Sequence, residues 1–110
     1  MNLDQRIETF RAFVARSPDD AFARYSLAMA LRAAGKLEDA VAEFVENTRR
    51  KPDYVPTYLM LGQVLGSLGR QAEAASFYRQ GAAAAGRTGD GHAQSEIGAA
   101  LEELRARGTP

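Results

Sequence analysis

The sequence predicts an all-α fold built from short antiparallel helix pairs. Apolar residues recur at the three- and four-residue spacing that places them on one face of a helix, as Leu27 and Leu31 do. Glycine interrupts the pattern at Gly35 and again at Gly69, where a residue in the left-handed region can end a helix without a Cβ penalty. A shift of 34 residues places Leu27 on Leu61, so the pattern occurs twice in phase.

The residue types that match under this shift are those required where two helices pack against each other. A small residue beside the apolar pair, Ala28 or Gly62, allows a second helix to approach closely. An aromatic residue on the second helix, Phe44 or Tyr78, then covers the apolar seam. The matched positions are Leu27, Ala28, Leu31, Gly35, Ala40, Phe44 and Pro52 in the first copy, and Leu61, Gly62, Leu65, Gly69, Ala74 and Tyr78 in the second.

This spaced set resembles the tetratricopeptide repeat family, whose repeat of about 34 residues has Leu-Gly-x-x-Tyr on its first helix, Ala and an aromatic on its second, and a closing Pro. The chain departs from the family pattern at its edges. Arg24 and Tyr58 replace the usual Trp, Asn47 and Gly81 replace a late Ala, and Gly86 stands where the second Pro is expected. The resemblance implies a right-handed α-solenoid of about six helices, whose first helices line a concave groove and whose second helices form the convex back.

Local signals suggest where the helices begin and end. Asn2 and Gln5 have the spacing of a capping box, and Ser17 is expected to be the N-cap of the next helix, with Pro18 at its first position. The segment 86–91 is rich in glycine and is expected to be a flexible loop with a two-residue insertion. We expect one domain over 1–110, with a half-repeat helix at 3–16, full repeats at 20–52 and 54–86, and a capping helix at 91–107.

The amino-acid composition argues against several classes of function. The 14 basic and 14 acidic side chains give a formal net charge of zero, so charge offers no case for nucleic-acid or anionic-membrane binding. Absence of cysteine excludes disulfides and thiol chemistry. The N-terminus does not resemble a signal peptide, and no apolar run reaches the about 18 residues of a membrane span, so a cytoplasmic location is expected. Arginine outnumbers lysine by 12 to 2, which suggests a GC-rich bacterial source.

Residue patterns typical of catalysis are scarce. His92 is the only histidine and reads as a surface residue in the first turn of a helix, so a two-histidine zinc site cannot be built. The basic run 49–51 stands at a helix C-terminus, where it complements the helix dipole. We expect no catalytic residue, no cofactor and no metal.

The first helix of each repeat carries more apolar residues than a solvent-exposed face needs. Two explanations are open: these side chains pack against the terminal helices, or they line a groove that binds an extended or helical peptide. The family's carboxylate clamp for chaperone C-termini is disfavoured, because Tyr25, Met29 and Met60 stand where it needs Lys or Asn. The candidate groove residues are Phe22, Tyr25, Met29, Arg32, Leu59, Gln63, Ser95 and Glu102.

The sequence therefore predicts a noncatalytic protein-interaction module that binds a peptide or partner protein in the groove of a short repeat array. The alternative is a structural self-association element, in which the same apolar patch forms a homodimer. The sequence does not identify the partner.

Overall fold

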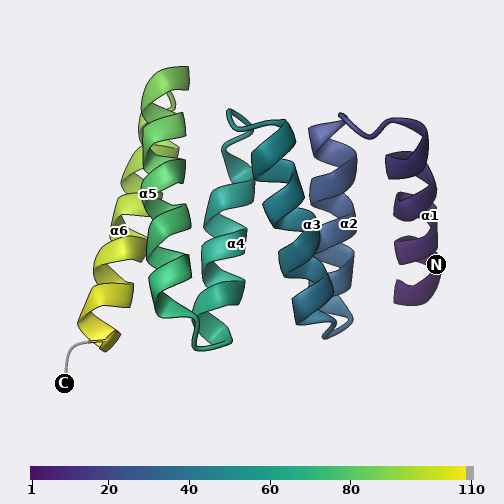
Figure 1. Cartoon of the computed structure of the whole chain (residues 1–110), viewed down its shortest axis with the longest axis horizontal. Helices are drawn as coiled ribbons and strands as arrows, with labels where there is room; N and C mark the ends of the chain where they lie inside the picture. Colours follow the sequence, from purple (N-terminus) through teal and green to yellow (C-terminus); the bar gives the residue numbers. More distant parts are fainter. Residues whose placement is uncertain (109–110) are drawn as a thin grey trace. The chain divides into compact units, whose positions relative to one another are not determined.

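The computed structural model describes residues 1–108, and in that range it contains six α-helices and no strand (Figure 1). The prediction of an all-α helical repeat is confirmed. The helices are α1 (Leu3–Arg16), α2 (Ala21–Ala33), α3 (Leu37–Arg50), α4 (Pro56–Ser67), α5 (Gln71–Thr88) and α6 (Gly91–Gly108).

The chain divides into two compact units, which we describe separately. Unit 1 is Met1–Lys51, in which α2 packs on α1 and on α3. Unit 2 is Pro52–Pro110, in which α5 packs on α4 and on α6, and α4 also touches α6. The prediction of one domain over 1–110, with its repeat boundaries, stays a prediction.

The core of unit 1 forms along the α2–α3 contact. Leu31 and Phe44 have no exposed surface, and Leu27 is 2% exposed. The small residues Ala28 and Ala40 are also fully buried, because they lie where the two helices approach each other. These are the residues that the repeat pattern placed in the helix contact.

In unit 2 the close approach of α4 and α5 depends on glycine. A Cβ atom at Gly62 would overlap the ring of Tyr78, and a Cβ atom at Gly81 would overlap the Cβ of Tyr58. Both tyrosines are buried. Each glycine therefore leaves room for the tyrosine side chain of the opposite helix.

Three residues that depart from the family pattern form hydrogen bonds to backbone carbonyl groups. Arg24 donates from Nη2 to the carbonyl oxygen of Pro18 at 3.2 Å, and Tyr58 donates from its hydroxyl to the carbonyl oxygen of Pro52 at 2.6 Å. Each donor acts on the proline six residues before it, so arginine and tyrosine make equivalent bonds in the two units. Asn47 is 1% exposed and donates from Nδ2 to the carbonyl oxygen of Ala21 at 3.1 Å, which joins α3 to α2.

The predicted helix ends are partly correct. The capping box of Asn2 and Gln5 is present, and Gly35 and Gly69 both have a φ of 77°, as expected of left-handed residues. Ser17 is not the N-cap of α2: its carbonyl oxygen instead accepts from the Asp20 N–H at 3.0 Å and closes a turn. The carboxylate of Asp20 accepts from the Ala23 N–H at 3.0 Å, so Asp20 is the N-cap.

The segment 86–91 is not a loop, contrary to expectation. Helix α5 continues to Thr88 and ends at Gly89, whose φ is 74°. The alanines at 82–85 favour helix and extend it beyond the repeat boundary. The Asp90 N–H then donates to the carbonyl oxygen of Ala85 at 2.9 Å, while the Asp90 carboxylate accepts from the Ala93 N–H at 3.0 Å and caps the start of α6.

Candidate functional site

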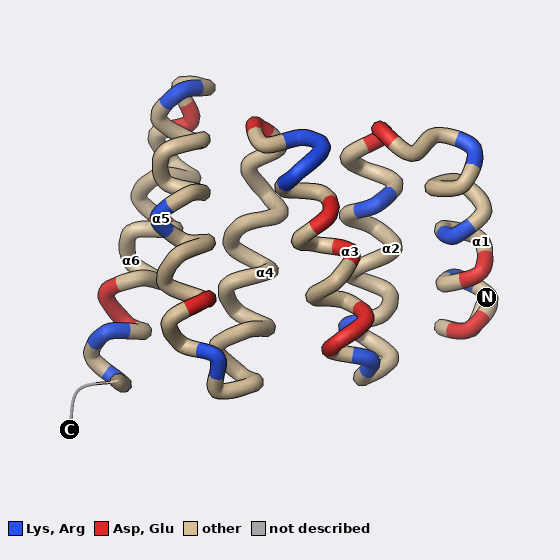
Figure 2. Tube along the Cα trace, in the orientation of Figure 1, with Lys and Arg blue, Asp and Glu red and all other residues tan. Residues whose placement is uncertain are grey.

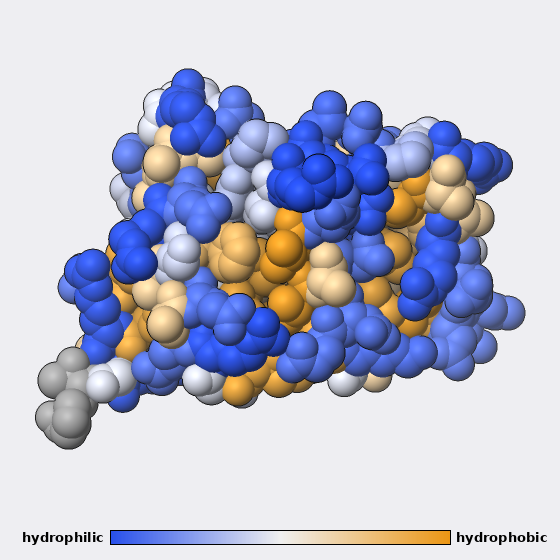
Figure 3. All heavy atoms as spheres, viewed as in Figure 1, coloured by the Kyte–Doolittle hydropathy of each residue, from blue (hydrophilic) through white to orange (hydrophobic). Residues whose placement is uncertain are grey.

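In unit 1 the candidate residues lie along one helix face. Phe22, Tyr25, Met29 and Arg32 are all in α2, at spacings of three or four residues that align them on one side. Phe22 is 65% exposed, which is high for an aromatic residue, and the other three are of intermediate exposure. We call these four residues the α2 face. Figure 3 shows hydrophobic side chains at the surface over α1 and α2.

Tyr25 belongs partly to the core. Its ring meets the buried ring of Phe44 in an edge-on arrangement, with the ring centroids 6.0 Å apart. Burial raises the pKa of the Tyr25 hydroxyl above its ordinary value, and the positive charge of Arg32 opposes this by a smaller amount. Tyr25 therefore packs in part against α3 rather than against a terminal helix, while Phe22 is a surface residue.

The remaining candidates lie in unit 2. Leu59 and Gln63 are one turn apart on α4, where Leu59 is half-buried and Gln63 is exposed. Helix α4 contains no charged residue (Figure 2), so this part of the candidate surface is uncharged. Ser95 and Glu102 are exposed on α6, and Glu102 accepts a hydrogen bond from Arg105 at 3.0 Å. The structure thus groups four candidates on α2 and, separately, two on α4 and two on α6.

Sequence reasoning missed an exposed aromatic on α1. Phe13 is 45% exposed, and its ring centroid lies 6.4 Å from that of Phe10. The guanidinium of Arg16 lies over the Phe13 ring, 5.1 Å from its centroid. The available signal was the 34-residue shift, which aligns Phe13 with Asn47 and so places a large apolar side chain where α3 has a buried polar one.

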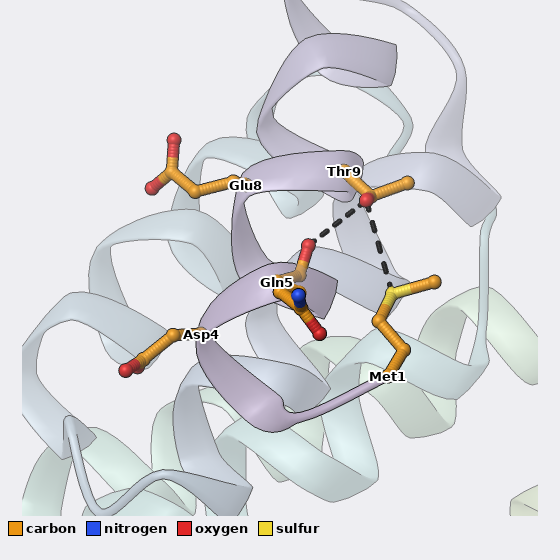
Figure 4. Close-up of a pocket in the computed structure, with 5 residues that line it drawn as sticks. All are labelled: Met1, Asp4, Gln5, Glu8 and Thr9. Atoms are coloured by element: carbon orange, nitrogen blue, oxygen red, sulfur yellow. Dashed lines mark hydrogen bonds between the residues drawn. The ribbon is translucent and has the colours of Figure 1, made fainter.

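A shallow depression beside the first turns of α1 is lined by Met1, Asp4, Gln5, Glu8 and Thr9 (Figure 4). The Thr9 hydroxyl donates to the carbonyl oxygen of Gln5 at 2.8 Å. Asp4 and Glu8 point away from the Met1 side chain. These acids are not gathered around a common point, so the depression does not have the form of a catalytic or cation site.

The basic run 49–51 is largely compensated by acids. Glu46 accepts from Arg49 Nε at 2.9 Å and from Arg50 Nε at 2.5 Å, and these bonds lower the pKa of the Glu46 carboxyl to about 2. The same bonds raise the pKa of both arginines. Arg50 also donates from Nη1 to Asp19 at 2.9 Å. The run is therefore part of an ion-pair network rather than an open anion site.

Within residues 1–108, no group of three or more His, Cys, Asp or Glu side chains is placed to hold a metal ion. His92 is exposed in the first turn of α6. No helix in the same range is long and apolar enough to cross a membrane. The described residues offer a ligand two exposed aromatic side chains, Phe22 on α2 and Phe13 on α1, and the more exposed of the two is Phe22.

Comparison with known proteins decides the family. The sequence profile of the tetratricopeptide repeat matches residues 2–85. The chain belongs to the tetratricopeptide repeat family. The solution structure of a tetratricopeptide repeat domain protein from Salinibacter ruber is 33% identical, with a TM-score of 0.78 over 82% of this chain and 91% of that one. A crystal structure of a Salinibacter ruber tetratricopeptide repeat domain protein is 34% identical, with a TM-score of 0.75 over 78% of this chain and 97% of that one.

More distant structures share the fold. PcrH in complex with the chaperone binding region of PopD has a TM-score of 0.88 at 19% identity, over 97% of this chain and 81% of that one. The yeast Sti1 TPR2B domain, solved in a complex with pHsp70, has a TM-score of 0.87 at 16% identity, over 96% of this chain and 84% of that one. No match was found among curated proteins.

Proposed function

We propose that this tetratricopeptide repeat protein is a noncatalytic interaction module and that the α2 face binds a segment of a partner protein. The observation on which the proposal rests is the exposure of Phe22, whose side chain is 65% exposed beside two further apolar residues of the same face. An exposed apolar patch rimmed by polar residues is a common mark of a protein-binding surface. Met29 adds a flexible side chain that can adapt to the shape of a ligand.

The four residues have different roles in this proposal. Phe22 supplies most of the free apolar area, and aromatic anchors commonly dominate the energetics of an interface. Tyr25 is held by Phe44, so its side chain loses less conformational entropy when a ligand binds. Arg32 places a positive charge at the end of the face and favours a partner segment with an acidic residue near its apolar anchors.

A second contact surface is proposed for unit 2. Leu59 and Gln63 lie on the uncharged helix α4, so they suit an apolar or amide side chain of a partner rather than a charged one. Ser95 and Glu102 are exposed polar candidates on α6. That these faces line one concave groove stays a prediction of the family resemblance.

Relatives of the same fold support a protein segment as the ligand. The PcrH structure contains the chaperone binding region of PopD, and the Sti1 domain was solved with pHsp70. In both, a helical repeat of this kind is found with part of another protein. The proposal applies that class of partner to this chain and does not identify the partner.

The experiment uses peptides selected from a displayed random library on the immobilised chain, followed by NMR titration of the isotopically labelled protein. We expect the largest amide shift changes in α2 around Phe22 and Met29. Selected peptides that shift only residues outside α2 and α4 would overturn the proposal. The matched control is Val45→Ser on α3, which removes an apolar side chain that is 37% exposed but lies outside the proposed surface.

The homodimer alternative makes a different prediction for the same residues. If the α2 face paired with its copy, Phe22→Ser would lower the mass measured by light scattering, while Val45→Ser would not. A concentration-dependent mass that Phe22→Ser abolishes would favour self-association over partner binding.

A further inference from the structure

The sulfur atoms of the chain all belong to methionine. The sequence has three methionines and no cysteine, so an oxidant such as hydrogen peroxide finds no thiol to attack. Met29 is part of the α2 face, whereas Met1 and Met60 are not. We propose that Met29 is a site of reversible oxidation and that its sulfoxide releases the partner segment from the α2 face. The effect on binding rests on the function proposed above.

The three sulfur-containing side chains differ in their contacts. The Thr9 hydroxyl donates to the Met1 sulfur at 3.9 Å (Figure 4), and Met60 also interacts with another residue. Within residues 1–108, by contrast, no hydrogen bond reaches the Met29 sulfur. The lone pairs of this sulfur are therefore available to an electrophilic oxygen donor.

Met29 is also placed where a small oxidant can reach it. It is of intermediate exposure, while its neighbours Ala28 and Ala30 are buried in the core. Long side chains in a helix lean towards its N-terminus, so the Met29 thioether is expected over the turn that holds Tyr25. Hydrogen peroxide is little larger than water, so a half-buried position does not exclude it.

The reaction uses one peroxide molecule and only the sulfur of the protein. A lone pair of the Met29 sulfur attacks one peroxide oxygen, so that an S–O bond forms and the O–O bond breaks. The proton on the transferred oxygen passes to the departing hydroxide, which leaves as water. Sulfur is oxidised by two electrons and the peroxide is reduced by two. A reductase that uses thiols reverses the change: the sulfoxide oxygen leaves as water while two thiols form a disulfide.

Oxidation would make the middle of the α2 face polar. Met29 follows Phe22 by seven residues and Tyr25 by four, so the three side chains lie along one side of the helix. A sulfoxide oxygen is a hydrogen-bond acceptor that has to remain solvated or find a donor. An apolar partner side chain seated beside Phe22 and Met29 would remove its water without replacing the hydrogen bonds.

Oxidation should act on binding rather than on folding. Met29 is only partly covered in the free protein, unlike the fully buried Leu31 of the same helix. Methionine has several rotatable bonds, so a half-buried sulfoxide can turn its oxygen towards water. The helices should therefore persist after oxidation while the affinity for the partner segment falls.

The first measurement locates the oxidised residues and needs no partner. The intact chain is treated with dilute hydrogen peroxide and digested, and cleavage after arginine leaves the three methionines in different fragments. Mass spectrometry should show that Met29 gains one oxygen atom faster than Met60. Met1 is 80% exposed and should also be oxidised, but it is outside the α2 face. A Met29 that stays reduced while Met60 is oxidised would overturn the proposal.

The second measurement is calorimetric titration with one selected peptide that contains neither methionine nor cysteine. Oxidised wild type should have a Kd about tenfold or more above that of the reduced protein, and methionine sulfoxide reductases with a thiol should restore the affinity. Met29→Leu keeps an apolar side chain of similar volume but has no sulfur, so its Kd should be the same before and after peroxide. Met60→Leu is the matched control and should respond to peroxide as the wild type does.

Three further results would contradict the proposal: an oxidised wild type with an unchanged Kd, a Met29→Leu variant that loses as much affinity to peroxide as the wild type, or loss of the helical circular dichroism signal on oxidation. In the last case release would come from unfolding. Phe22→Ser distinguishes this inference from the proposed function. If that variant binds the peptide as the wild type does, the α2 face is not the binding surface, whereas the order in which Met29 and Met60 are oxidised does not depend on the peptide.

Discussion

The rings of Tyr25 and Phe44 meet edge-on, with centroids 6.0 Å apart and planes inclined by 61°. Phe44 is fully buried in the contact of α2 with α3, whereas Tyr25 is only partly covered. The pair therefore connects the proposed binding face to the core of unit 1. Residues of the α2 face should respond differently to substitution, according to whether they touch this core.

Tyr25→Ser should lower the free energy of unfolding by about 1–3 kcal/mol, because it removes an aromatic contact and uncovers Phe44. Phe22→Ser should change that free energy by less than about 0.5 kcal/mol, since Phe22 is 65% exposed. Chemical denaturation followed by circular dichroism measures both. Equal destabilisation by the two variants would show that the division between core and surface is wrong.

Gly62→Leu should destabilise unit 2 by about 1–3 kcal/mol or more, because its side chain would occupy the space of the Tyr78 ring. Gly98→Ala is the matched control, since the same position on α6 has no atom within 4 Å of a Cβ. It should stabilise the helix by about 0.5–1 kcal/mol through lower backbone entropy in the unfolded chain. A Gly62→Leu variant that melts at the wild-type temperature would contradict the packing described for α4 and α5.

Glu43→Gln should destabilise unit 1 by about 2–4 kcal/mol. Arg24 donates from Nη1 to Glu43 at 2.6 Å, and the Arg24 side chain is 10% exposed, so its charge would be left buried without a carboxylate. The Nε atom of Arg24 already has no hydrogen-bond partner among the described residues. Glu8→Gln, in an exposed pair with Arg11 on α1, should cost less than about 0.5 kcal/mol. Thermal melts of both variants test the comparison.

The stability contributed by Glu46 should depend on pH in a defined direction. Its pKa in the folded chain is about 2, below the ordinary value of 4.5, because Arg49 and Arg50 bind the ionised form. A depressed pKa stabilises the folded state above the unfolded pKa, and this stabilisation is lost as pH falls towards 2. The wild type should therefore exceed Glu46→Gln in stability at pH 7, and the difference should shrink between about pH 5 and pH 2. A difference that is constant over this range would contradict the ion-pair network.

Local sequence signals predicted helix ends best at positions where the backbone conformation admits few residue types. Gly35 and Gly69 were expected to be left-handed, and both are, because few other residues adopt that conformation without strain. Ser17 was wrongly expected to cap α2. Serine and aspartate are both good N-caps, and the turn closed by the Ser17 carbonyl places Asp20 at the correct position instead. Sequence alone does not decide between two good caps three residues apart.

The candidate site stays a prediction, and only part of its geometry follows from the sequence. Helical spacing puts Phe22, Tyr25 and Met29 on one side of α2. It did not indicate that Tyr25 lies against Phe44, because that contact joins two helices and depends on how closely they approach. The exposure of Phe13 was missed for a similar reason, since it depends on which helix faces α1 rather than on the apolar series within α1.

The most direct test of the proposed function is calorimetric titration of one selected peptide into the wild type, Phe22→Ser and Val45→Ser. Loss of an aromatic anchor should raise the Kd of Phe22→Ser by at least about 30-fold, the equivalent of about 2 kcal/mol, while the Kd of Val45→Ser stays within about twofold of the wild type. All three proteins should keep the same melting temperature within about 3 °C. Equal peptide affinity of the wild type and Phe22→Ser would contradict the assignment of the α2 face as the binding surface.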